Sequence, residues 1–390
     1  MSDVSDPVRP QVLVYVPHGG IPDRRGFSPS IVACEFAKRM RACVPYFVAA
    51  AEGDPRGPGQ WERFPVERLP PRRLYTRLCK LGLRPPGITL AADFVDICKK
   101  APPALIHAHQ LEFPVRELRR RLGRRPPVIV HAHVVSQKPL EARGFAERYI
   151  AVSDYVGVSL AGMGYPPERI VTIRNGVDTR LFRAADSQEA VLAKEALGID
   201  PRVPVLAFVG RKHDIKGYPA FLAVAERLLE DRRPLFILAV GADPERPTGE
   251  GGFMASRERE RRLVATGRFR SLPAMPQADL AGLYRAIDVT LLPSLAETQG
   301  MAIIESLASG CVTISARVGG VRETLESGVT GFLVDDPHDT DALYEKTAHV
   351  LDNLPELVPL RAAARAYAVA NLDWSVGAAQ LEALYRTILG

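Results

Sequence analysis

The sequence predicts an α/β protein made of two halves, each built on a parallel sheet. Short apolar runs alternate with helical segments, and the alternation restarts after a polar stretch near residue 185. Each half also has about the size of a nucleotide-binding α/β unit. Strands that alternate with helices pair in parallel, because each helix carries the chain back to the same end of the sheet.

The first half opens with the apolar run 12–17, and Gly19 and Gly20 follow in a loop. Ser28 and Pro29 then mark a helix start, because Ser caps a helix and Pro suits its first position. The other strands that we expect in this half are residues 46–50, 104–108, 128–130 and 149–152.

The second half is expected to contain strands at residues 205–210, 236–241, 289–292, 313–316 and 331–334. Helical patterns occur at residues 218–230, 256–266, 278–286, 300–308, 340–353 and 376–389. The stretch from Ala184 to Asp186 is polar and has no hydrophobic period, so we expect the joint there. The expected division is therefore 1–184 and 185–365, with a last segment, 366–390, whose helix packs back on the first domain.

Composition favours a globular protein of the cytoplasm. Hydrophobic residues make up 46% and charged residues 25% of the chain, which is ordinary for a folded protein. The five cysteines are scattered and form no C-x-x-C pair, which favours a reducing compartment. The N-terminus has no apolar leader, and no apolar run approaches the roughly 18 residues of a spanning helix, so we expect neither a signal peptide nor a transmembrane segment.

The net charge of +6 is unevenly distributed. The densest basic run extends from Arg116 to Arg125. It is interpreted either as a solvated helix face or as a surface that attracts a phosphorylated acceptor or anionic lipid at the inner membrane face. Nucleic acid is not expected as a partner, because no aromatic residues are interleaved with the arginines. The Pro- and Arg-rich stretch 54–86 does not have the pattern of regular structure, and we interpret it as an acceptor loop or a variable surface insertion.

A charged loop follows the strand that ends at Gly210, and it contains Arg211 and Lys216. Ligands of parallel α/β proteins bind outside the carboxyl ends of strands, where Gly210 allows a close backbone approach. Arg211 can hold two phosphate oxygens at once and Lys216 adds a point charge. The loop therefore predicts a phosphate site, and solvated loop cations are the alternative.

The stretch from Glu297 to Glu305 combines a polar turn with the start of a helix near Gly300. Such a helix start offers unpaired N–H groups and a positive dipole end, which suit a phosphate. Glu297 lies in the turn and Glu305 lies more than one helical turn further on. We expect the two carboxylates to contact different parts of one elongated ligand. Downstream, Gly319 and Gly320 form either another close backbone approach or a plain turn.

These motifs resemble the retaining nucleotide-sugar glycosyltransferases known as family four. The family's E-x-F-G run with a second Glu eight residues later corresponds to Glu297, Gln299, Gly300 and Glu305, with Gln299 in place of Phe. The run from Asn175 to Asp178 resembles the P-N-G-V-D run, with Arg174 in place of Pro. The resemblance covers residues 125 to 390 well and the first hundred weakly, and it implies the GT-B fold, in which two facing Rossmann-like domains enclose a donor cleft.

The resemblance also implies roles for individual residues. Arg211 and Lys216 would bind the diphosphate, together with backbone N–H groups near Gly300, Met301 and Ala302. Glu305 would hold the ribose hydroxyls, and Glu297 would contact the donor sugar. Gly19 and Gly20 would face the diphosphate or the acceptor, and Asn175 would line the cleft.

Two His-x-His pairs, His107/His109 and His131/His133, follow apolar runs in the first half, so each pair can project from one strand face. Four histidines suggest a metal site, but no acidic or cysteine ligand accompanies them, and we expect no metal. By resemblance, His133 lies near the donor sugar and His109 lines the cleft. A structural histidine at a strand end is the alternative for both.

The resemblance implies that His133, Arg211, Lys216 and Glu297 take part in the transfer of a hexose-type sugar with retention of its anomeric configuration. Fixed cations would stabilise the leaving diphosphate, so neither a cofactor nor a divalent metal is implied. The donor would be a nucleotide sugar of the UDP or GDP type, and the acceptor a glycan, a lipid-linked sugar or a small molecule. A sugar-nucleotide epimerase of the same fold and a non-catalytic sugar-nucleotide-binding relative are the alternatives.

Overall fold

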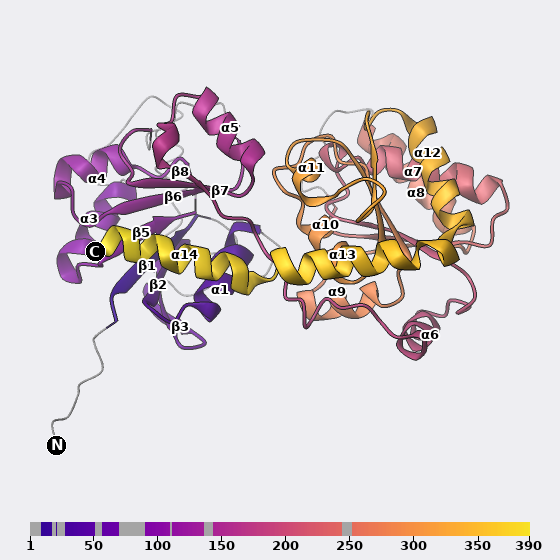
Figure 1. The fold of residues 1–390 in the computed structure, drawn as a ribbon, viewed down its shortest axis with the longest axis horizontal. Coiled ribbons are helices and arrows are strands. Elements are labelled where there is room, and N and C mark those ends of the chain that lie inside the picture. Colours follow the sequence, from indigo (N-terminus) through magenta and orange to yellow (C-terminus); the bar gives the residue numbers. More distant parts are fainter. Residues whose placement is uncertain are drawn as a thin grey trace, which may run out of the picture. The chain divides into compact units, whose positions relative to one another are not determined.

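The computed structural model describes residues 9–17, 21, 28–50, 57–69, 90–109, 111–135, 143–243 and 252–390. The chain divides into two compact units. Unit 1 consists of Met1–Arg174 together with Gly377–Gly390, and unit 2 of Asn175–Val376. Each unit contains one sheet with helices packed on it, which confirms the predicted α/β class (Figure 1).

Unit 1 is built on an eight-stranded sheet with the order β3-β4-β2-β1-β5-β6-β7-β8. All neighbouring strands pair in parallel except β3 and β4. The strands are β1 (Gln11–Val16), β2 (Val44–Ala50), β3 (Gly57–Trp61), β4 (Phe64–Leu69), β5 (Leu105–Ala108), β6 (Val128–Ala132), β7 (Arg148–Ala151) and β8 (Ile170–Thr172). The helices are α1 (Ser28–Arg39), α3 (Leu90–Lys100), α4 (Val115–Leu122), α5 (Asp154–Gly162) and the 3-10 turn η1 (Pro167–Arg169), and the unit also holds most of α14 (Trp374–Leu389).

Unit 2 is built on a six-stranded, fully parallel sheet with the order β11-β10-β9-β12-β13-β14. The strands are β9 (Val205–Val209), β10 (Phe236–Val240), β11 (Phe269–Leu272), β12 (Val289–Leu292), β13 (Val312–Ala316) and β14 (Phe332–Val334). The helices are α6 (Ser187–Ala196), α7 (Tyr218–Glu230), α8 (Gly252–Ala265), α9 (Gln277–Tyr284), α10 (Met301–Ala308), α11 (Val321–Thr324), α12 (Thr340–Asp352) and α13 (Val358–Asn371), with the 3-10 turns η2 (Asp214–Lys216) and η3 (Leu354–Leu357).

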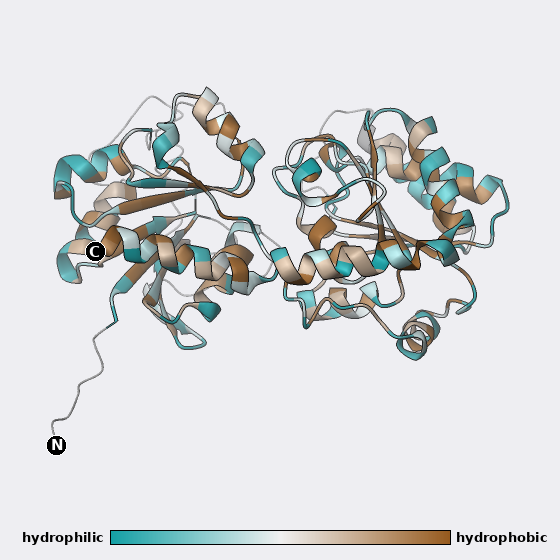
Figure 2. Cartoon of the chain, viewed as in Figure 1, coloured by the Kyte–Doolittle hydropathy of each residue, from teal (hydrophilic) through white to brown (hydrophobic). Residues whose placement is uncertain are grey.

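The strands of unit 2 are mainly apolar, and both faces of the sheet are buried. Along β9, Leu206 and Phe208 belong to one buried cluster, whereas Val205, Ala207 and Val209 belong to another. Successive side chains of a strand point to opposite faces, so each cluster is the core on one side of the sheet. Figure 2 shows the strands of both units in the colours of hydrophobic residues.

The stretch 54–86 was expected to lack regular structure, and its described part contradicts this. Residues 57–69 form β3 and β4, and β4 pairs with β2. Phe64 and Val66 are 2% and 1% exposed, and Trp61 stacks on Phe64. These two short strands are stabilised by pairing with the rest of the sheet. Prolines and glycines are uncommon in strands, so their presence in this segment led to the expectation of irregular structure. The strands β8 and β11 were also not among those expected from the sequence.

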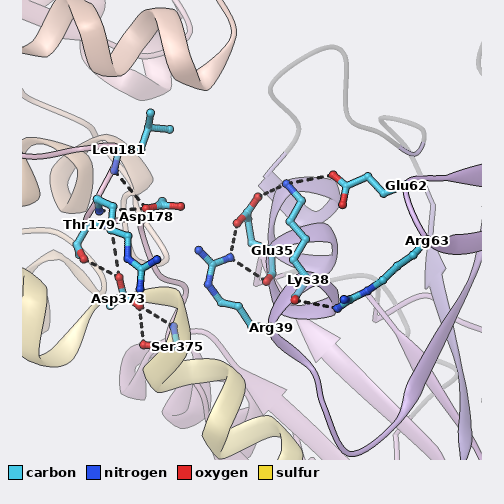
Figure 3. Close-up of polar contacts among 11 residues, drawn as sticks. Glu35, Lys38, Arg39, Glu62, Arg63, Asp178, Thr179, Leu181, Asp373 and Ser375 are labelled. Atoms are coloured by element: carbon cyan, nitrogen blue, oxygen red, sulfur yellow. Dashed lines mark hydrogen bonds and ion pairs between the residues drawn. The ribbon is translucent and has the colours of Figure 1, made fainter.

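The division between the units differs from the expected joint at Ala184–Asp186, since it falls after Arg174. The reason is that the residues after Arg174 bind within unit 2. Val177 pairs with Asp373 in a β-bridge, and the Thr179 hydroxyl donates to the Asp373 carboxylate at 2.6 Å (Figure 3). Asp178 accepts hydrogen bonds from the following backbone N–H groups and holds this turn in place.

The end of the chain returns to unit 1, but the return begins later than the expected segment 366–390. Residues 366–376 remain in unit 2, and Gly377–Gly390 belong to unit 1. There the hydroxyl of Tyr385 lies 2.6 Å from Nδ1 of His107, and the Glu382 carboxylate accepts from the backbone N–H of Ala42 at 2.7 Å. Gly377 is required at this point, because a Cβ would lie 2.9 Å from the ring of Phe36 on α1.

Candidate functional site

Three loops of unit 2 meet at the carboxyl ends of β9, β12 and β13, which are neighbours in the sheet. The backbone N–H of Leu295 donates to the carbonyl of Ile215 at 2.9 Å. The N–H of Gly320 donates to the carbonyl of Glu297 at 3.1 Å. The strand order and these two bonds bring the predicted motifs of the second half together at one edge of the sheet, as expected for parallel strands.

Gly217 joins the first two loops by close packing. A Cβ at this position would lie 1.8 Å from the carbonyl oxygen of Pro293, and the backbone has φ of +69°. Only glycine fits both the contact and this left-handed conformation. Lys216, one residue earlier, is therefore held beside the second loop.

Lys216 and Glu297 form an ion pair across the two loops. The Lys216 ammonium donates to Oε1 of Glu297 at 2.6 Å, and the Ser294 hydroxyl donates to the same oxygen at 2.9 Å. The side chain of Lys216 is 25% exposed and that of Glu297 is 12% exposed. An ammonium has three N–H donors, so Lys216 keeps donors for a second anionic group.

The neighbouring cations differ sharply in their surroundings. Arg211 is exposed, and its guanidinium has no hydrogen-bond partner among the described residues. Lys212 is buried and donates to the Ser271 hydroxyl at 2.6 Å, with carboxylates of Asp243 and Glu260 at 3.9 Å. Burial lowers the pKa of Lys212. Lys212 thus has a structural role, whereas Arg211 is available to a ligand.

Glu305 lies on α10 and is 4% exposed. Burial raises its pKa to about 7, although Gln277 donates to its Oε1 at 3.2 Å and favours the charged form. A buried carboxyl with one neutral donor is poorly solvated. Its acceptor capacity is therefore suited to a ligand that supplies hydroxyl donors.

The helix α10 begins directly after Gly300, whose φ is +89° and which no side chain caps. The first N–H groups of a helix, here those of Met301 and Ala302, have no partner within the helix. With the helix dipole, they form a site that suits an oxyanion. Gly300, Met301 and Ala302 thus stand as expected at a helix N-terminus.

Gln299 holds this segment in place by pairing with the backbone of Asn175. Its Nε2 donates to the Asn175 carbonyl at 3.0 Å, and its Oε1 accepts from the Asn175 N–H at 2.8 Å. Both residues are buried, at 1% and 6% exposure. No sequence pattern indicates this pairing, because the partners are 124 residues apart in the chain. Asn175 Oδ1 is buried without a hydrogen-bond partner among the described atoms.

In unit 1, His107, His109, His131 and His133 form a buried cluster, which we call the histidine cluster. Neighbouring rings stack with centroids 4.3 to 5.4 Å apart. Burial lowers the pKa of all four, to about 3 for His107 and His133, so the rings are neutral at pH 7. The roles expected of His109 and His133 toward a donor stay predictions, and Gly19 and Gly20 lie outside the described residues.

The basic run forms α4 and the turn after it, and its arginines have different surroundings. Arg119 is turned inward and donates to the Pro126 carbonyl at 2.9 Å. Arg116, Arg120, Arg124 and Arg125 are exposed. Figure 2 shows α4 largely in the colour of hydrophilic residues. No helix within the described ranges is long and apolar enough to cross a membrane.

Solved structures with the same architecture define the class of fold. The Anabaena protein HepE in complex with UDP and glucose aligns with a TM-score of 0.76 at 21% identity, over 97% of this chain and 100% of that one. Sucrose-phosphate synthase from Thermosynechococcus elongatus aligns with a TM-score of 0.80 at 20% identity, over 97% and 99% of the two chains. The two Rossmann-like units therefore have the GT-B type of fold.

Sequence comparison identifies the family. Residues 23–181 match the sequence model of "Glycosyltransferase Family 4", and residues 203–353 match that of "Glycosyl transferases group 1". A D-inositol 3-phosphate glycosyltransferase of Thermobispora bispora is 34% identical over 57% of this chain and 52% of its own length. A second enzyme of this name, from Catenulispora acidiphila, is 33% identical over 59% and 54%. The chain spans about half the length of these curated relatives. It belongs to the family-four glycosyltransferases, as the resemblance implied.

Proposed function

We propose that this protein transfers a hexose-type sugar from a nucleotide diphosphate to an acceptor, with retention of the anomeric configuration. One observation carries the proposal, namely that unit 2 holds the Lys216–Glu297 pair, the start of α10 and, within that helix, the buried Glu305. A cation, an oxyanion site and a carboxyl group that accepts hydrogen bonds from hydroxyls, all in one unit, match the successive parts of a sugar nucleotide.

Each group has a role that follows from its chemistry. Lys216 and Arg211 bind the diphosphate, and the N–H groups of Met301 and Ala302 donate to its oxygens. Glu305 accepts from the ribose hydroxyls. Glu297, fixed by Lys216 and Ser294, accepts from hydroxyls of the donor sugar.

The proposed chemistry depends on charge. Breaking the bond between the anomeric carbon and the diphosphate places negative charge on the leaving phosphate. Lys216 and Arg211 stabilise this charge where it develops, and the leaving phosphate takes the proton of the acceptor hydroxyl. The acceptor attacks from the face that the phosphate leaves, which retains the configuration. The protein needs no covalent intermediate for this step.

UDP-hexoses are the first donors to test, with GDP-hexoses second. HepE was solved with UDP and glucose, which supports the choice of base. The acceptor is a glycan, a lipid-linked sugar or a small molecule. The relatives named for D-inositol 3-phosphate support the inclusion of phosphorylated polyols among the small molecules tested.

The decisive experiment compares Lys216→Ala with Lys99→Ala, an exposed lysine at the end of α3 in unit 1. The assay measures donor hydrolysis and sugar transfer through the amount of nucleoside diphosphate that is released. Loss of one charge-stabilising donor is expected to lower kcat/KM about 100-fold or more, and Lys99→Ala should match the unsubstituted protein. Unchanged turnover in Lys216→Ala would contradict the proposal.

The same assay separates the alternatives. An epimerase would convert one nucleotide sugar into another without release of the nucleoside diphosphate. A non-catalytic relative would bind a nucleotide sugar and turn over none. Either result would replace the transferase assignment.

The exposed arginines of α4 and of the turn after it support a further part of this proposal, a contact with an anionic acceptor or membrane surface at the cytoplasmic side. Arg120 and Arg124 are exposed, and their guanidinium groups have no hydrogen-bond partner within the described residues. Replacing both by Gln should abolish co-sedimentation with vesicles that contain anionic lipid. Neither the substituted nor the unsubstituted protein should bind neutral vesicles. Binding that survives the double substitution would count against this surface.

A further inference from the structure

The histidine cluster has an arrangement that the proposed transfer reaction does not explain. His107 lies on β5 and His131 on β6, and these strands are neighbours in the sheet. His109 and His133 follow two residues later on the same strand faces, so the sequence spacing brings all four rings together. The rings are 0% to 9% exposed, and Phe36 of α1 stacks against His131.

One nitrogen on each of three rings, those of His107, His109 and His133, is already bonded. Nδ1 of His107 lies 2.6 Å from the Tyr385 hydroxyl, and Nδ1 of His109 lies 2.9 Å from Nε2 of His133. These bonds leave Nε2 of His107 and Nε2 of His109 for another partner. Histidines that bind metals show this pattern, because a hydrogen bond at the second nitrogen fixes the tautomer and the orientation of the ring.

The remaining nitrogens include buried atoms without partners. Nε2 of His107 and both nitrogens of His131 are buried and have no hydrogen-bond partner among the described residues. A buried polar atom without a hydrogen-bond partner destabilises the folded state. A bound cation would satisfy the lone pair of one nitrogen on each ring, since a neutral imidazole offers one acceptor nitrogen.

The distances are close to those of a metal site. One ring nitrogen from each of His107, His109 and His131 lies within 4.8 Å of the other two. A tetrahedral zinc ion with Zn–N bonds of about 2.1 Å holds its ligand nitrogens roughly 3.4 Å apart. Binding of Zn²⁺ would draw the three nitrogens together from separations of at most 4.8 Å to this spacing.

We propose that His107, His109 and His131 bind one divalent transition-metal ion, with Zn²⁺ as the best match, and that Tyr385 and His133 orient two of the ligands. Neutral imidazoles without carboxylates favour Zn²⁺ over Mg²⁺ or Ca²⁺, which require oxygen ligands. Three-histidine zinc sites with a fourth position open to water are known in enzymes. The proposal does not depend on the proposed transfer activity.

The first test uses the full chain without a histidine tag, stripped with a chelator and then given one equivalent of Zn²⁺ or Co²⁺. After gel filtration we expect about one ion per chain, with the visible absorption of tetrahedral Co²⁺ and X-ray absorption that shows imidazole nitrogens around Zn²⁺. Retention below a tenth of an equivalent would overturn the proposal. Thiolate ligation in either spectrum would also overturn it, because the ion would then be bound by cysteines.

The second test uses matched substitutions. His131→Ala should lose the ion, whereas His338→Ala, at an exposed histidine of unit 2, should keep it. Tyr385→Phe removes only the hydroxyl beside His107 and should weaken Zn²⁺ binding 10- to 100-fold. Tyr344→Phe, whose hydroxyl bonds to Asp231, is the control and should bind as the unsubstituted protein does.

His131→Ala can fail to fold, since its ring is fully buried. In that case Tyr385→Phe and the spectra of the unsubstituted protein decide the question. Equal Zn²⁺ affinity in Tyr385→Phe and Tyr344→Phe would contradict the assigned outer contact and overturn the proposed arrangement.

Discussion

Replacement of Glu305 by Gln tests both the energetics of the site and the ribose role. In the protein without ligand, burial raises the pKa of Glu305 from the ordinary 4.5 to about 7. Such a rise corresponds to about 3 kcal/mol of free energy that disfavours the ionised form in the folded state. Gln has a similar shape, keeps a hydrogen-bond partner for Gln277 and carries no charge.

The sign of the pH effect follows from the two pKa values. Below pH 4.5 both the folded and unfolded chains hold the proton, so Glu305 has no effect on stability. Between pH 4.5 and 7 only the unfolded chain releases the proton, and the free energy of unfolding falls with rising pH. Above pH 7 the full loss of about 3 kcal/mol is present. Glu305→Gln should therefore stabilise the protein at pH 8 by up to this amount and have little effect at pH 4.5.

Donor binding should depend on the same proton. Ribose hydroxyls donate to the ionised carboxylate, so the protonated protein must release its proton to bind. With a pKa of about 7, a UDP-hexose should bind about tenfold more weakly at pH 6 than at pH 8. The diphosphate of a sugar nucleotide is a diester and does not titrate in this range, unlike the terminal phosphate of UDP.

Chemical denaturation at several pH values and calorimetric titration provide the measurements. Glu345→Gln, at an exposed residue of α12, is the control for loss of a carboxylate. If the unsubstituted protein and Glu305→Gln show parallel stability profiles between pH 5 and 8, the reasoning about burial is wrong. If Glu305→Gln binds the donor with the same pH dependence as the unsubstituted protein, the ribose role is wrong.

Two further predictions concern the contacts that hold the loops together. Gln299→Leu should lower the free energy of unfolding by about 2–4 kcal/mol, because the buried N–H and C=O of Asn175 both lose their partner. Denaturant titration measures the free energy of unfolding. Gly217→Ala should lower transfer activity about tenfold or more, since its Cβ would lie 1.8 Å from the Pro293 carbonyl and displace the loop; initial rates at saturating donor measure this.

Matched substitutions separate these effects from general ones. Gln188→Leu, at an exposed residue of α6, makes the same change without buried partners and should alter stability little. Gly198→Ala has a similar φ of +64° but no atom within 4 Å of the new Cβ. It therefore reports the backbone strain alone. Equal effects at Gly198 and Gly217 would show that the contact with Pro293 does not matter.

The sequence was sufficient to predict elements whose pattern is local. The apolar strands of unit 2 are buried on both faces, so they read as continuous apolar runs, and helices such as α7 at Tyr218–Glu230 follow their periodicity. The motif loops could be placed together for the same reason, because neighbouring parallel strands end at one edge of a sheet. The positions of Lys216, Glu297 and Glu305 follow from this topology.

Features that depend on partners far apart in the chain could not be predicted. β4 is a strand because it pairs with β2, and its own residues include a proline. Lys212 and Lys216 occur in one charged loop, yet only packing directs Lys212 inward to Ser271. Gln299 replaces the Phe of the family motif, and its pairing with Asn175 depends on a contact that no periodicity reveals.

The contacts found in unit 2 explain why two carboxylates eight residues apart need not act as an acid and base pair. Glu297 is partly exposed and neutralised by Lys216, whereas Glu305 is buried beside a neutral amide, so the two groups face different chemistry. The segment between them is fixed at Gln299, and at its far end the Ser306 hydroxyl lies 2.7 Å from the hydroxyl oxygens of two threonines. Because every one of these contacts lies within unit 2, the spacing between the two carboxylates is set by that unit alone. A rigid spacing suits two carboxylates that contact different parts of one elongated ligand better than two groups that must exchange protons with the same atom.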